Sequence, residues 1–302
     1  MLETYKTKPM NILYAYRNKL TPLIHKAIIQ GFSIPPSSAV EISQIKNLDL
    51  SVYDFVIIFG VISRKAKVAA ENAGVKIIFI DKSHIRLSKF RHIDEESFFR
   101  ITIDSWNPFR HYKTFEDRQD RGKAIRTYNG NFPDEIKPFN QGSKILFAGS
   151  SEKYHKYHNL SHPTEYAKSV MKEVKKYTDM EIVYRPKRTW RGKEKICGSE
   201  WEGDKRLFSQ VLKKVHPYCV ITHGSNCCID SLYSGYPTLI LGDAATKPIS
   251  STKIEDINSL YLATKEEKYK LSNSIGCFNW KLKEMSSGEM LTTLNPILEK
   301  EL

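Results

Sequence analysis

The sequence predicts an α/β protein built from two doubly wound, Rossmann-like domains. Apolar strands alternate with helical segments, the connections suit parallel crossovers, and the strand–helix pattern starts afresh near residue 144. The chain has 302 residues, a length that fits about two domains. A single large sheet is the alternative, and the irregular, charged stretch over 82–140 favours two domains over it.

The first domain is expected over residues 1–140. Its strands are expected over 10–16, 53–60 and 75–81. Helices are expected from Thr21-Pro22 to about Gly31, with proline at the first helical position, and over 61–74. This strand–helix–strand order is typical of a parallel sheet.

The second domain is expected over residues 141–302. Strands are expected over 144–149 and 180–188, and helices over 163–178 and 204–216. Residues 273–302 are expected to form helices that can cross back to the first domain.

The most informative segment is THGSNCCIDSLYSGYPTLILGD, residues 222–243. A short apolar strand ends just before it, and a helix is expected from Asn226 to Tyr233. Gly235 suits the left-handed conformation after a helix, and Pro237 prevents the helix from continuing. The loop between strand and helix exposes backbone N–H groups, an arrangement that suits a phosphate.

Composition limits the class of protein. The five cysteines contain no C-x-x-C pair, which argues against a zinc site or a disulfide framework. No apolar run is long enough for a membrane span and the start lacks a secretory signal, so we expect a cytoplasmic protein without a membrane partner.

The charge balance favours a polyanionic partner. Lys and Arg number 47 against 34 Asp and Glu, which gives a net charge of +13 spread over both halves of the chain. A merely solubilising surface is the alternative.

Several segments resemble GT-B-type glycosyltransferases, and within that class a group of phage-encoded enzymes. They are IVYRPKRTWRG (182–192), residues 220–250, FNWKLKEMSSGEM (278–290) and, more loosely, IIFIDKSHIR (77–86) and FFRITIDSWNP (98–108). The resemblance implies a GT-B-like fold, in which two Rossmann-like domains face a central cleft. It also implies that the C-terminal domain holds a nucleotide-sugar and the N-terminal domain an acceptor, often a hydroxymethyl pyrimidine in phage DNA.

The expected donor site uses groups that stabilise a diphosphate as the glycosidic bond breaks. Arginine suits bidentate phosphate contact and lysine supplies a point charge. The candidates lie at or after strand ends, where ligands bind in open α/β sheets: Gly149, Ser150, Arg185, Lys187, His223, Gly224, Ser225, Asn226, Asp230 and Asp243. A satisfied strand-end histidine, a solvated basic turn and plain loops are the alternatives for these positions.

An inverting reaction on a hydroxyl acceptor needs a carboxylate base. Asp81 is the first candidate because it ends the expected strand over 75–81, and Asp104 is the second. Capping of the following turn is the alternative role for Asp81, and the sequence leaves retention or inversion open.

The candidate DNA contacts combine basic residues with nearby aromatic side chains, a pattern that suits phosphates and stacked or flipped bases. They are Lys82, Arg86, Lys89, Arg91 and Arg100. A loop whose aromatic residues fix it to the domain is the alternative.

The resulting hypothesis is a nucleotide-sugar-dependent glycosyltransferase that modifies double-stranded DNA carrying hydroxylated pyrimidines. We expect a UDP-sugar as co-substrate, no tightly bound cofactor and a monomer. The sequence contains no Asp-x-Asp motif, so it does not imply a metal. A glycosyltransferase acting on an envelope glycan or a small molecule is the alternative. A non-catalytic nucleotide- or DNA-binding protein is a third reading.

Overall fold

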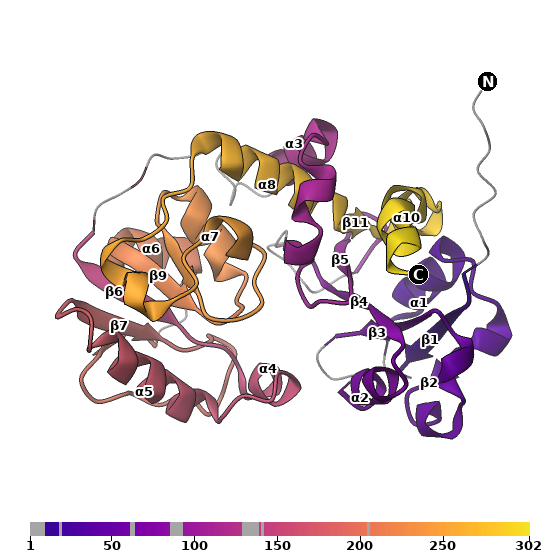
Figure 1. The fold of residues 1–302 in the computed structure, drawn as a ribbon, viewed down its shortest axis with the longest axis horizontal. Coiled ribbons are helices and arrows are strands. Elements are labelled where there is room, and N and C mark those ends of the chain that lie inside the picture. Colours follow the sequence, from indigo (N-terminus) through magenta and orange to yellow (C-terminus); the bar gives the residue numbers. More distant parts are fainter. Residues whose placement is uncertain are drawn as a thin grey trace. The chain divides into compact units, whose positions relative to one another are not determined.

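The computed structural model contains two compact units, whose elements are labelled in Figure 1. The residues that the structure describes are 10–17, 20–60, 64–84, 93–128, 139, 142–203 and 206–302. Of these, the first unit takes the residues up to Lys82, those from 93 to Asp104 and those from Trp280 onward. The second unit takes the others.

This division differs from the boundary expected near residue 140. Residues 105–128 belong to the second unit, and the chain returns to the first unit at Trp280. The reason is packing: helix α3 (Gln119–Tyr128) lies against α8 (Lys265–Cys277) of the second unit. A Cβ on Gly122 of α3 would lie 1.9 Å from Asn273 Oδ1, so only glycine permits this approach of the two helices.

The first unit contains a six-stranded sheet in the order β11-β5-β4-β3-β1-β2. Its strands are β1 (Ile12–Tyr16), β2 (Ala39–Glu41), β3 (Phe55–Phe59), β4 (Lys76–Lys82), β5 (Phe98–Ile103) and β11 (Asn279–Lys281). Strands β1 to β4 pair in parallel, whereas β5 runs antiparallel to β4. The side chains of Phe55 to Ile58 have no exposed surface, as expected for a central parallel strand covered on both faces.

The helices of the first unit come from both ends of the chain. They are α1 (Pro22–Gly31), α2 (Arg64–Asn72), α9 (Leu282–Ser286) and α10 (Glu289–Glu301). Pro22 occupies the start of α1, which confirms that prediction. Because α9 packs on α1, the C-terminal segment is part of the first unit's core.

The stretch over 82–140 is more regular than the sequence suggests. It contains β5 and α3, together with two short 3-10 turns, Pro108–Arg110 and Tyr112–Phe115. Strand β5 is buried at every position, yet its apolar pattern is interrupted by Arg100. The buried guanidinium of Arg100 pairs with Asp81 of β4, and this tertiary contact lets a charged residue occupy a strand interior.

The second unit contains a five-stranded, all-parallel sheet in the order β10-β9-β6-β7-β8. Its strands are β6 (Lys144–Ala148), β7 (Glu181–Arg185), β8 (Glu200–Trp201), β9 (Pro217–Thr222) and β10 (Thr238–Ile240). The chain starts in the middle, moves outward through β7 and β8, and then returns to the other side of β6. The strand order therefore reverses between β6 and β9, the topological switch point where doubly wound sheets bind ligands.

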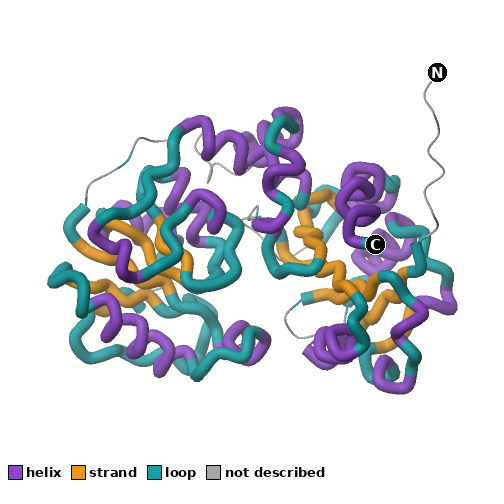
Figure 2. Tube along the Cα trace, in the orientation of Figure 1, coloured by secondary structure: helices purple, strands orange, loops and turns teal. Residues whose placement is uncertain are grey.

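Helices pack on both faces of this sheet; Figure 2 shows the strands in orange and the helices in purple. Helix α5 (Pro163–Val174) packs on one face, and α6 (Phe208–Val215) and α7 (Cys227–Tyr233) pack on the other. The second unit also contains α3, α8 and α4 (Glu152–Tyr157). Ile145 and Phe147 of β6 join the core under α5, whereas Leu146 joins the core under α6. This alternation follows from the two-residue period of a strand.

The strand–loop–helix–strand prediction for residues 219–241 is confirmed. Strand β9 leads into α7, Gly235 follows the helix with φ of 86°, and β10 begins after Pro237. In the part of the chain that the structure describes, no helix combines the length and apolar character that crossing a membrane requires.

Candidate donor site and catalytic carboxylates

The carboxyl ends of β6, β7, β9 and β10 lie at one edge of the second sheet, because these strands are parallel neighbours. The predicted donor residues follow these ends: Gly149 and Ser150 after β6, Arg185 and Lys187 at β7, His223 to Asn226 after β9, and Asp243 after β10. The Gly149 N–H donates to the Arg185 carbonyl at 2.9 Å, which joins the first two loops. The topology thus brings together residues that are far apart in the sequence.

The β9–α7 loop is held by short polar side chains. Thr222 Oγ1 donates to the Ala148 carbonyl at 2.9 Å, tying the end of β9 to the end of β6. The N–H groups of Ser225 and Cys227 lie 3.4 Å from Thr222 Oγ1 and Ser225 Oγ respectively, so both contacts are long. Asp230 lies in the first turn of α7 and is partly buried.

His223 belongs to a cluster of rings rather than standing alone. Its Nδ1 lies 3.1 Å from the Tyr154 hydroxyl of α4, and its ring packs so closely on Gly242 that a Cβ there would lie 2.1 Å away. Burial, with smaller effects from His155 and Lys247, lowers the pKa of His223 from 6.5 to about 4. His223 is therefore neutral at pH 7 and can offer a hydrogen bond but no positive charge.

Positive charge at this edge comes from β7 and the loop that follows it. The Arg185 guanidinium lies 5.1 Å from the centre of the Phe208 ring and donates to the Arg206 carbonyl at 3.2 Å. Stacking of this kind fixes the plane of an arginine while leaving its charge. Lys187 is exposed in the loop after β7.

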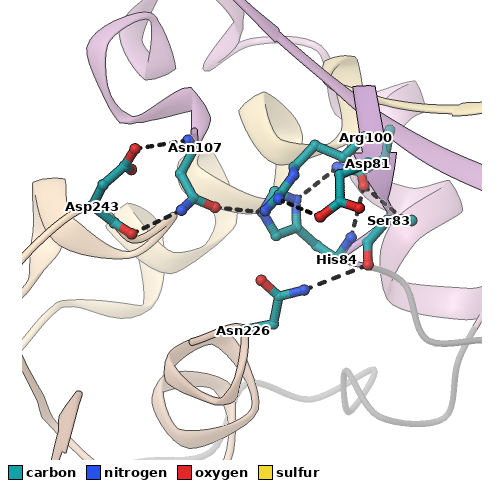
Figure 3. Close-up of polar contacts among 8 residues, drawn as sticks. Asp81, Ser83, His84, Arg100, Asn107, Asn226 and Asp243 are labelled. Carbon is teal, nitrogen blue, oxygen red and sulfur yellow. Dashed lines mark hydrogen bonds and ion pairs between the residues drawn. The ribbon is translucent and has the colours of Figure 1, made fainter. Parts of the chain in front are cut away.

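Asp243 is anchored by Asn107, a residue that no sequence motif marks (Figure 3). The Asn107 N–H donates to Asp243 Oδ2 at 3.2 Å, and Asn107 Nδ2 donates to the Asp243 carbonyl at 2.8 Å. Asn107 is 1% exposed. The loop after β10 is thus fixed to the segment in which the chain enters the second unit.

His84 and Asn279 extend this network, and the bonds assign its donors and acceptors. Asn279 Oδ1 accepts from Ser83 Oγ at 2.6 Å and from the His84 N–H at 3.0 Å, so the Asn279 amide nitrogen faces His84 Nδ1 at 3.1 Å. His84 Nδ1 is then the acceptor, and Nε2–H donates to Asn107 Oδ1 at 2.9 Å. The side-chain donors therefore run in one direction, from Asn279 Nδ2 to His84, from His84 Nε2 to Asn107 and from Asn107 Nδ2 to the Asp243 carbonyl.

A further contact connects this network to the predicted phosphate loop. Asn226 Nδ2 lies 3.5 Å from the Ser83 carbonyl, as drawn in Figure 3. Arg121, which is 8% exposed, donates to the Asn279 carbonyl at 2.7 Å. The sequence did not single out His84, Asn107, Asn279 or Tyr154, because each of them bonds to a residue far away in the chain.

The two candidate catalytic carboxylates lie at opposite ends of β4 in the first unit. Asp81 is near the carboxyl end and forms an ion pair of 3.2 Å with Arg100, its cross-strand partner on β5. Asp104 follows β5, and its N–H donates to the Ile77 carbonyl at the start of β4. The rise of a strand separates Ile77 from Asp81 by roughly 13 Å, so the two carboxylates cannot share one site on this sheet.

The candidate DNA contacts have different outcomes. Lys82 is exposed at the end of β4. Arg86, Lys89 and Arg91 lie outside the described residues. Arg100 is 3% exposed and paired with Asp81, so assigning it to a DNA surface was wrong: its guanidinium is part of the sheet interior.

Among the residues that the structure describes, no three or more His, Cys, Asp or Glu side chains are grouped so that they could hold a metal ion. The free thiols of Cys219, Cys227, Cys228 and Cys277 are buried, and Cys197 is exposed.

Comparison with known proteins identifies the fold. No protein-family model matches the sequence, and no curated protein matches it. The β-Kdo 2,4 transferase of Thermosulfurimonas dismutans KpsC aligns with a TM-score of 0.50 and 11% identity over 88% of this chain and 90% of that chain. The fold is GT-B-like. The β-Kdo 2,7 transferase of the same KpsC aligns equally well, with a TM-score of 0.50 and 14% identity over 86% of this chain and 89% of that chain.

The anchoring of Asp243 in this GT-B-like protein can be tested by changing Asn107. We expect Asn107→Ala to lower the free energy of unfolding by about 1–3 kcal/mol, because the buried His84 Nε2–H and Asp243 carbonyl lose their partner. Asn107→Asp should cost at least as much, since a carboxylate oxygen would replace the donor facing that carbonyl. Urea unfolding measures both, with the exposed Thr114→Ala as control; equal stability of all three variants would contradict the anchoring role.

The buried state of His223 predicts a pH effect on stability. A histidine in the unfolded chain takes up its proton near pH 6.5, whereas folded His223 does so only near pH 4. Stability is therefore lost as the pH falls from 6.5 to about 4. Between pH 6.5 and pH 4, the free energy of unfolding should fall less for His223→Gln than for the wild type, by about 1–3 kcal/mol. Thermal unfolding measures both. The two proteins should have parallel profiles above pH 6.5, and parallel profiles below it would show that His223 is protonated in the folded protein.

Proposed function

We propose that the protein is a glycosyltransferase that uses a nucleotide-sugar. The observation that carries this proposal is the meeting of four polar loops at the switch point of the second sheet, in a chain with a GT-B-like fold. Open α/β sheets bind ligands in this place. A basic and hydrogen-bonding edge suits a nucleotide that carries phosphate.

The donor site would work by stabilising the phosphate that leaves the sugar. Arg185 and Lys187 would supply positive charge, and neutral His223 would supply a hydrogen bond from Nε2 while Tyr154 holds its Nδ1. His223 and Arg185 are held by their contacts with Tyr154 and Phe208, and preorganised groups are what electrostatic stabilisation of a transition state requires. Anchored Asp243 would accept from a hydroxyl of the sugar or ribose, and we expect the nucleotide to be UDP.

The acceptor in this proposal is a hydroxylated pyrimidine in double-stranded DNA. The net charge of +13 suits a polyanionic acceptor. Transfer to a hydroxyl requires removal of a proton, and Asp81 is the proposed base. Its pairing with Arg100 orients the carboxylate and holds it at the carboxyl end of β4.

A second candidate acceptor is a glycan. Both KpsC structures are named as Kdo transferases, and Kdo is a sugar. The same donor chemistry would serve this acceptor, so an experiment on transfer must separate the two.

Transfer can be tested directly with purified protein, hydroxymethylated duplex DNA and a panel of nucleotide-sugars. After digestion to nucleosides, mass spectrometry should find the modified base heavier by one hexose or pentose. Unmodified DNA is the control and should gain nothing. No gain combined with nucleotide binding in a thermal-shift assay would favour the glycan acceptor, and the absence of both would contradict the glycosyltransferase.

The position of the base gives a sharper test. Asp81→Asn should lower kcat by roughly 10²–10⁴-fold while nucleotide binding stays unchanged, because a proton acceptor is lost without loss of a donor contact. Asp104→Asn is the matched control, since this carboxylate lies at the opposite end of β4. An equal loss of turnover in both variants would argue against Asp81 as the base.

A further inference from the structure

The loop over residues 186–199, between β7 and β8, carries a local excess of positive charge. It contains five Lys and Arg residues and one Glu. Lys187, Arg188, Arg191 and Lys195 are exposed. We call this segment the basic loop. Of its residues, only Lys187 was assigned a role above, in the donor site.

Two acidic residues that follow the basic loop pair with lysines of other elements in the second unit. Glu200 pairs with Lys144 of β6 at 2.7 Å. Glu202 is 3% exposed and pairs with Lys214 of α6 at 2.5 Å.

The basic loop is anchored to the unit. Trp190 and Ile196 are 8% and 3% exposed, and the Trp190 N–H donates to the Lys187 carbonyl at 2.9 Å. Lys193 Nζ reaches the carbonyls of Arg188 and Gly203, both at 3.4 Å. A surface held in this way needs less ordering when a partner binds, which favours affinity.

Its place in the fold brings this surface next to the candidate donor site. The loop leaves β7 at Arg185, whose carbonyl accepts from the Gly149 N–H of the β6 loop. A polyanion bound to the basic loop would therefore run beside the edge where the donor loops meet, within a single unit.

We infer that the basic loop binds the phosphate backbone of duplex DNA and so positions the acceptor strand. This rests on the proposed function for the identity of the polyanion. Arginine and lysine on an ordered surface suit phosphates, and such contacts fix position without reading sequence. A membrane surface fits less well, because binding there uses exposed apolar side chains and Leu207 is the one large exposed apolar residue in the described part of 185–207.

The test compares two triple variants that remove equal charge from exposed positions. The loop variant is Arg188→Ser, Arg191→Ser and Lys195→Ser. The control, on α5 and the turn that follows it, is Lys168→Ser, Lys172→Ser and Lys176→Ser. Binding of a fluorescein-labelled, unmodified duplex is followed by anisotropy at several salt concentrations. The loop variant should bind roughly 10–100-fold more weakly at low salt, and its plot of log affinity against log salt should be shallower by up to about 3.

The control variant should bind DNA better than the loop variant, and thermal shift with UDP should be the same for the loop variant and the wild type. Equal DNA binding by both variants overturns the inference. The inference is also overturned if the wild type does not bind DNA but binds phosphatidylglycerol vesicles, and if Leu207→Asn abolishes the vesicle binding. Loop-dependent DNA binding without sugar transfer would leave the surface in place and overturn only the proposed acceptor reaction.

Discussion

The hydrogen bonds of the Asn279 side chain are the constraint on which the candidate donor site of the second unit depends. They hold Ser83 and His84, and His84 in turn holds Asn107, which holds Asp243. Asn279, the Ser83–His84 pair and Asn107 all lie within three residues of a point where the chain passes from one unit to the other. Because the network is buried and directional, a change at one crossing is felt at the loop after β10.

Local pattern was enough to predict much of the fold, and distant partners explain the rest. The apolar run Phe55–Phe59 and the segment from β9 to β10 follow from periodicity and from Gly235 and Pro237. Strand β5 was not predicted from the sequence, because a buried Arg100 needs the ion pair with Asp81 on the neighbouring strand. The Asn279–His84 contact joins residues 195 positions apart, and no local rule reports such a pair.

Burial decides which side chains of the candidate donor site are charged. Topology placed the predicted residues at one edge, as the alternation of strands and helices suggested, but their electrostatic roles needed the structure. Burial among rings keeps His223 neutral, so Arg185 and Lys187 carry the positive charge there. The sequence identified these residue types. It did not predict the rings around Tyr154, whose packing makes His223 a neutral hydrogen-bonding group and not a charged one.

The return of the chain to the first unit at Trp280 has a consequence for synthesis. Strand β1 of the first unit is made before the second unit, yet the first unit lacks α9 and α10 until residues 282–301 have been made. The second unit, complete by Asn279, can close its sheet earlier. The second unit can therefore fold before the first during translation, and neither unit can be cut out as one continuous gene segment.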